Sequence, residues 1–87
     1  MTDEQKDLLL EQGAEDGTVI LDGFDRAIVG ITDDARLVYS YDLMVNQYVE
    51  DNECGEEDAI EWIEYNTIRS IPYIGEYRPV IYRPLAI

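Results

Sequence analysis

The chain has 87 residues, of which 20 are Asp or Glu, 6 are Lys or Arg and none is His, so its formal net charge is -14 at pH 7. That length predicts a single domain over positions 1–87 and excludes barrel and doubly wound enzymes, which need about 150 residues or more. With one Cys and no His, we expect neither an internal disulfide nor a structural zinc site, and the charge disfavours direct binding to nucleic acid or to an anionic membrane.

The N-terminal part of the chain predicts a short helix, a loop and a strand. A helix over 2–12 would be capped by Thr2 or Asp3, and the glycine that follows would end it. We therefore expect a peripheral N-terminal helix within 1–16. A four-residue strand is expected next, at 18–21.

The clearest local pattern is a hairpin. Positions 27–31 are rich in β-branched residues, and positions 36–41 alternate polar with apolar residues. The short polar segment 33–35 between them is typical of a hairpin loop. Gly30 interrupts the first strand, which indicates a bulge or a close backbone approach.

Two helices are expected after the hairpin. The first would run from a cap at Ser40 or Asp42 to about Asp51. The second would span about 56–70, where acids in the first turn suit the positive end of the helix dipole and Pro72 would stop the helix. The residues expected on the core face of the second helix are Ala59, Ile60, Ile63 and Thr67.

The chain then predicts an aromatic loop at 73–78 and a final strand at 79–83, whose flanking prolines suit an edge strand. The element order is helix, short strand, hairpin, two helices and strand. This order predicts an α+β fold, in which a small antiparallel sheet (the hairpin plus the C-terminal edge strand) packs against the helical pair.

The negative charge is concentrated in the two-helix segment. Positions 37–68 contain no basic residue, whereas eight of the 20 acids lie within 50–64. Glu57, Glu61 and Glu64 have i, i+4, i+7 spacing, so they should form a row on one helix face. The candidate partner-binding residues are Glu50, Asp51, Glu53, Glu57, Asp58, Glu61 and Glu64.

Two interpretations of this acidic row stay open. Its charge spacing resembles that of a nucleic-acid strand, which carries one phosphate per about 3.4 Å, so it would fit a basic cleft of another protein. Alternatively, the row is only a solvated face or the mark of an acid-rich source. A possible second contact surface consists of Trp62, Tyr73 and Tyr77, for which packing of the aromatic loop against Trp62 is the competing explanation.

The sequence gives little indication of a metal site or of catalytic residues. Positions 51–57 carry acids at alternate places, but Gly55 comes one place too early for an EF-hand loop. Ser40 and Ser70 have no partner that would activate a nucleophile, and neighbouring acids oppose thiolate formation at Cys54. We expect no enzymatic activity, no metal and no cofactor.

Three sequence segments resemble one group of proteins. The run EDAIEWIEYNTIR at 57–69, PVIY at 79–82 and FDRAIVG at 24–30 resemble small acidic proteins common in phages and prophages. The resemblance covers roughly 24–83, and it implies no catalytic residue because the family has no established activity. In size and charge the chain is also similar to phage-encoded inhibitors that imitate DNA, such as anti-restriction, anti-CRISPR and uracil-DNA glycosylase inhibitor proteins.

These observations lead to a functional hypothesis and one alternative. The hypothesis is a phage-encoded, non-enzymatic nucleic-acid mimic that blocks the nucleic-acid-binding cleft of a basic host protein. The alternative is a small structural or self-associating module, a homodimer included, whose acids serve only solubility. The start MTDEQKD is acidic on balance and is not the basic start of a signal peptide, which favours the cytoplasm of the host cell.

Overall fold

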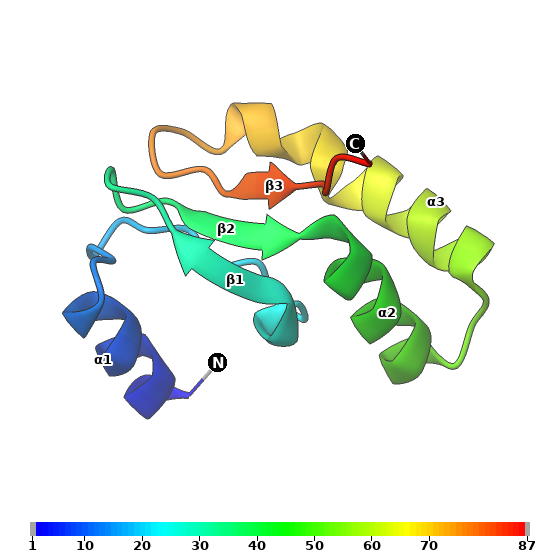
Figure 1. Ribbon diagram of the computed structural model, residues 1–87, viewed down its shortest axis with the longest axis horizontal. Coiled ribbons are helices and arrows are strands. Elements are labelled where there is room, and N and C mark those ends of the chain that lie inside the picture. Colours follow the sequence, from blue (N-terminus) through cyan, green and yellow to red (C-terminus); the bar gives the residue numbers. More distant parts are fainter. Residues whose placement is uncertain (1, 87) are drawn as a thin grey trace.

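Three α-helices and a three-stranded sheet form the computed structural model, which describes residues 2–86 (Figure 1). The predicted α+β fold class is confirmed. In chain order the elements are α1 (Asp3–Glu11), a 3₁₀ turn (Asp25–Ala27), β1 (Ile28–Ile31), β2 (Leu37–Ser40), α2 (Tyr41–Asn52), α3 (Glu56–Asn66), a second 3₁₀ segment (Ile68–Tyr73) and β3 (Val80–Tyr82).

The sheet has the strand order β1-β2-β3. Strands β1 and β2 form the predicted antiparallel hairpin, and their register shifts between Ile28 and Gly30, which confirms the bulge. The prediction of an all-antiparallel sheet was wrong, because β3 pairs with β2 in parallel, with Val80 opposite Val38. The reason is that α2 and α3 together form a crossover that returns the chain to the end of the sheet where β2 begins.

The strand predicted at 18–21 does not form. The Leu21 N–H donates to the Tyr39 hydroxyl oxygen at 2.8 Å, and the Val19 N–H donates to the Tyr77 carbonyl at 3.4 Å. The two N–H groups therefore bond to β2 and to the loop before β3, rather than to one neighbouring strand. The segment contributes apolar side chains to the core instead, with Ile20 and Leu21 packed against it.

The helix starts follow the predicted capping. Thr2 caps α1 in a reciprocal capping box with Gln5, and the Ser40 hydroxyl accepts the Leu43 N–H at the start of α2. Helix α3 ends at Asn66, four residues earlier than expected, and Pro72 lies inside the 3₁₀ segment that follows. Because proline has no N–H and clashes with the carbonyl four residues earlier, the chain leaves α-helical geometry before reaching it.

The core lies between the sheet and the two central helices. Leu37 and Tyr39 from β2 are fully buried against Met44 from α2 and Ile63 from α3. The predicted core face of α3 is confirmed, with Ala59, Ile63 and Thr67 buried and Ile60 partly buried. Helix α1 is peripheral, because none of its residues is buried. Its partly buried Leu9 packs against the core.

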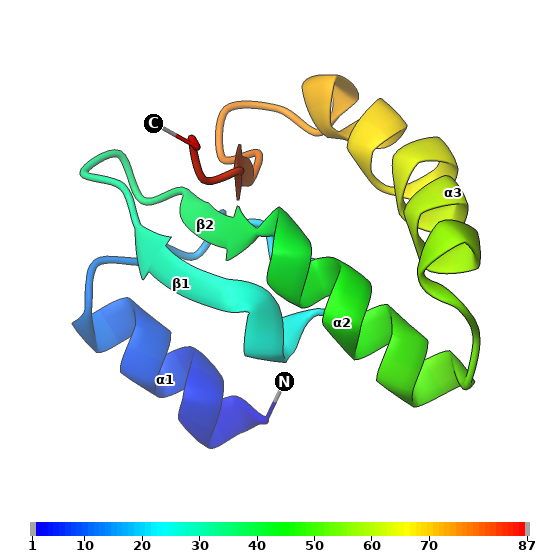
Figure 2. The same ribbon diagram turned by 45° about the vertical axis from the view of Figure 1, so that its right-hand side comes forward.

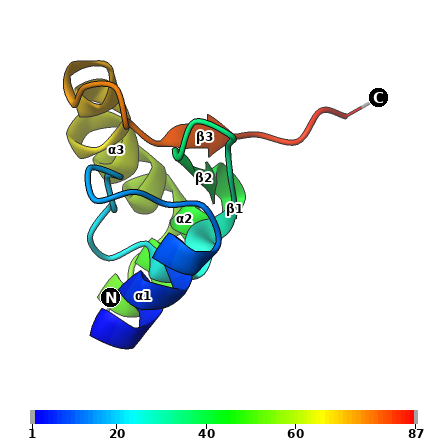
Figure 3. The same ribbon diagram turned by 90° about the vertical axis from the view of Figure 1, so that its left-hand side faces the viewer.

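The helical pair covers one side of the sheet. Figures 2 and 3 show α2 and α3 on the same side of the three strands, while α1 lies apart beside β1. The outer faces of α2 and α3 are consequently exposed to solvent, and most of the predicted binding residues lie on them.

Candidate protein-binding surface

The outer side of α3 carries exposed carboxylates. Glu57, Asp58 and Glu61 are exposed on this helix, and Glu53 is exposed at the end of α2. None of these four acids forms an ion pair within residues 2–86. We call the four residues Glu53, Glu57, Asp58 and Glu61 the acidic face.

The other three predicted residues are paired with arginines. Arg26 contacts both Glu50 and Asp51, with N–O distances of 3.2 and 3.1 Å, and Arg83 contacts Glu64 at 3.2 Å. The segment 37–68 contains no basic residue, but arginines from other parts of the chain partly neutralise it. Sequence reasoning missed these pairs because Arg26 and Arg83 belong to elements far away along the chain.

Glu53 stands out for its backbone conformation. It follows the last residue of α2 with φ 50° and ψ 44°, which is the left-handed conformation that glycine adopts most easily. A side chain at this position costs conformational energy. The chain thus carries a carboxylate at a helix end where a glycine would be more stable.

A groove borders the acidic face, between the C-terminal end of α2 and one flank of α3. It has a volume of about 490 Å³. The residues that line it are Tyr48, Asn52, Cys54, Asp58, Glu61, Trp62, Tyr65 and Asn66. Trp62 stacks on Tyr48 with ring centroids 4.8 Å apart, and the Phe24 ring lies 6.4 Å from it.

The three residues of the predicted second contact surface have different surroundings. Trp62 remains 41% exposed within the groove, and Tyr73 is 88% exposed after α3. The Tyr77 hydroxyl donates a hydrogen bond to Glu15, which raises the pKa of the tyrosine, and its ring lies against Gly17. The rings that contact Trp62 come from Tyr48 and Phe24, so the expected packing of the aromatic loop on Trp62 was wrong.

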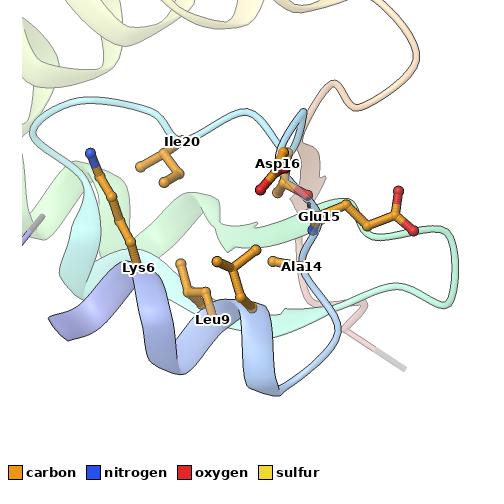
Figure 4. Close-up of a pocket in the computed structure, with 8 residues that line it drawn as sticks. Lys6, Leu9, Ala14, Glu15, Asp16 and Ile20 are labelled. Carbon is orange, nitrogen blue, oxygen red and sulfur yellow. Dashed lines mark hydrogen bonds between the residues drawn. The ribbon is translucent and has the colours of Figure 1, made fainter. Parts of the chain in front are cut away.

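A smaller cavity lies away from the acidic face, between α1 and the loop that follows it. Figure 4 shows Leu9, Ala14 and Ile20 around this cavity, with Lys6 and Asp16 at its edge. Its volume is about 160 Å³. Aliphatic and polar side chains both line it, and no acid of the acidic face contributes to it.

Three further observations concern the kinds of site that the chain offers. Among residues 2–86, no group of three or more Cys, Asp or Glu side chains is placed to hold a metal ion. No helix in the same part of the chain has the length and apolar character needed to cross a membrane. No protein-family model, curated protein or solved structure matches this chain.

Proposed function

We propose that this chain is a non-enzymatic binding protein that recognises a basic partner protein through the acidic face. The observation that carries the proposal is that Glu53, Glu57, Asp58 and Glu61 are exposed and have no ion pair within residues 2–86. Like charges three and four residues apart on a helix destabilise it by a few tenths of a kcal/mol per pair. A cationic partner would relieve that repulsion.

The partner class that fits best is a nucleic-acid-binding protein. Glu57, Asp58 and Glu61 together span a rise of about 6 Å along the helix, so their mean spacing of about 3 Å is comparable with the one phosphate per about 3.4 Å of a nucleic-acid strand. We infer that the chain acts as a nucleic-acid mimic, encoded by a phage, that occupies a Lys- and Arg-lined cleft in the host cytoplasm. Association between such surfaces is fast and falls steeply with salt.

A second function is supported by the exposed aromatic residues. Tyr65 and Tyr73 are 67% and 88% exposed, and Trp62 is half-exposed. A structural or self-associating module would use these rings as contacts and the acids only for solubility. Salt separates the two functions, because an apolar interface holds or tightens at high salt whereas an acidic mimic dissociates.

The test compares two variants that each remove three negative charges. Changing Glu57→Gln, Asp58→Asn and Glu61→Gln neutralises the centre of the acidic face. The matched control changes Glu4→Gln, Asp7→Asn and Glu11→Gln, three exposed acids on α1. Glu64 stays unchanged because its carboxylate bonds both Tyr41 and Arg83.

Each immobilised variant is incubated with bacterial host lysate at low salt, with and without competing double-stranded DNA. We expect the unmodified chain and the control to retain a basic protein that DNA displaces. The α3 variant should bind that protein with a dissociation constant at least about tenfold higher. Equal retention by the α3 variant contradicts the proposal. Retention that persists at high salt, together with concentration-dependent sedimentation, supports the structural module instead.

A further inference from the structure

We propose that the groove between α2 and α3 receives an arginine side chain of the basic partner. The groove is defined by the residues that line it, from Tyr48 on α2 to Asn66 at the end of α3. This inference rests on the proposed function and names the group that the partner presents. The acidic face attracts the partner, and the groove selects arginine over lysine.

The walls of the groove are aromatic. The stacked pair of Tyr48 and Trp62 forms one wall, and Tyr65, which is 67% exposed, contributes a third ring. A guanidinium is planar and stacks on such rings more readily than an ammonium, which is compact and strongly hydrated. Aromatic walls therefore favour arginine among the cationic side chains.

The polar groups of the groove are mainly hydrogen-bond acceptors. Asp58 and Glu61 line it as carboxylates without an ion pair within residues 2–86. Asn52 and Asn66 donate their amide N–H groups to the carbonyls of Tyr48 and Trp62, each at 3.0 Å. Their side-chain oxygens are thus left as acceptors.

Arginine has the complementary chemistry. Its side chain has five N–H donors and no acceptor, in a fork that matches carboxylates. No Lys or Arg lines the groove. The volume of about 490 Å³ lies within the range of about 300–1,000 Å³ that ligand pockets span, so an arginine with its adjoining backbone fits.

The molecule already places guanidinium groups on tyrosine rings at two sites, one of which is a ring of the groove. The Arg83 guanidinium carbon lies 4.0 Å from the centroid of the Tyr41 ring. The Arg69 guanidinium carbon lies 5.2 Å from that of Tyr65, one turn beyond the groove. The second pair shows that the Tyr65 ring already contacts a guanidinium of the chain itself, so the partner's arginine shares this ring with Arg69 and meets two carboxylates in the groove.

Trp62 is the only tryptophan in the chain, so its fluorescence reports directly on the groove. The probes are two unstructured peptides of equal length and charge, one alternating Gly with Arg and the other alternating Gly with Lys. We expect the Arg peptide to change the Trp62 emission saturably and to bind about tenfold more tightly than the Lys peptide. Affinity is measured independently by calorimetry.

Two single variants locate the effect. Tyr65→Leu removes an exposed ring of the groove, and Tyr73→Leu removes an even more exposed ring outside it. We expect Tyr65→Leu to weaken the preference for arginine, because the Tyr48 and Trp62 rings remain, and Tyr73→Leu to leave it unchanged. Both side chains lie at the surface, so neither change removes a core contact.

The outcomes distinguish the two proposals. Equal affinities for the two peptides, or a preference that Tyr65→Leu leaves undiminished, overturn the arginine groove while leaving binding to a basic partner in place. Absence of calorimetric binding by both peptides at low salt counts against the groove and the proposed function together. A preference for arginine that is weakened in Tyr65→Leu but not in Tyr73→Leu supports both.

Discussion

The Tyr41 hydroxyl donates a hydrogen bond of 2.9 Å to the Glu64 carboxylate, joining the first turn of α2 to α3. Arg83 completes the contact, because its guanidinium lies over the Tyr41 ring and donates to the same carboxylate at 3.2 Å. Arg83 directly follows β3. One cluster therefore ties the edge strand to both helices, and it withdraws Glu64 from the acidic face.

Removing the Tyr41 hydroxyl should destabilise the fold. In Tyr41→Phe the Glu64 carboxylate loses a donor, and hydrogen bonds to charged groups contribute about 1.5–3 kcal/mol, with the lower end expected at this half-exposed site. Urea denaturation at neutral pH measures the change in the free energy of unfolding. Tyr82→Phe is the control, since Tyr82 is also partly exposed on β3. Equal stability of the two variants contradicts the assigned role.

Replacing Glu53 by glycine should stabilise the protein. The residue has a left-handed backbone with φ 50°, which costs a side-chain-bearing residue about 1–2 kcal/mol relative to the right-handed helix. We expect Glu53→Gly to raise the free energy of unfolding by about 1 kcal/mol, as measured by urea denaturation. Glu53→Gln removes the same charge but keeps the strained backbone. An equal rise in Glu53→Gln would assign the effect to charge instead.

Local sequence signals predicted the elements whose geometry depends on neighbouring residues. The caps at Thr2 and Ser40 and the bulge near Gly30 all involve contacts within a few residues, and all are present. The direction of β3 was not predictable in this way, because it depends on how the two helices cross the sheet. The absent strand at 18–21 has the same explanation, since its N–H donors find partners far along the chain.

The candidate site was predictable only in part, for a related reason. Helical spacing predicted a row of Glu57, Glu61 and Glu64 on one face of α3, of which Glu57 and Glu61 are exposed whereas Glu64 is partly buried and paired with Arg83. Spacing along one helix cannot show that Arg26 reaches across to α2, nor that Tyr48 stacks on Trp62 to build a groove wall. Contacts between elements decide which acids are neutralised and where a side chain of a partner fits.

Tyr39 should make the fold sensitive to alkaline pH. Burial raises its pKa from the ordinary value of 10.0 to about 12, so the folded state keeps the phenol protonated where the unfolded chain ionises it. The contribution of Tyr39 to the free energy of unfolding is therefore fully present below about pH 10 and is lost as the pH rises toward 12. Phenolate absorbance measured alongside unfolding checks this. If Tyr39 ionises with the exposed tyrosines while the protein stays folded, the prediction is wrong.

The Tyr39 hydroxyl also accepts the Leu21 N–H at 2.8 Å. In Tyr39→Phe that donor loses its partner in a part-buried place, which costs about 1–3 kcal/mol. The variant should be less stable at neutral pH but should lose less stability between pH 10 and 12 than the unmodified chain. Parallel pH profiles of the two proteins contradict the role of Tyr39 in the alkaline transition.

A change at Glu61 tests whether the acidic face lowers the free energy of unfolding of the protein. It lies four residues from Glu57 and three from both Asp58 and Glu64, so Glu61→Gln removes three repulsive pairs and should raise the free energy of unfolding by about 0.5 kcal/mol at low salt. The gain should vanish near 1 M salt, where the screening length is about 3 Å.

Glu57→Gln is the control, because Glu57 also interacts favourably with the N-terminal dipole of α3 and its removal should be nearly neutral. A Glu61→Gln protein that is more stable yet binds the Arg peptide more weakly shows that this carboxylate serves binding at the expense of stability. A less stable Glu61→Gln protein would instead make Glu61 part of the support of the fold.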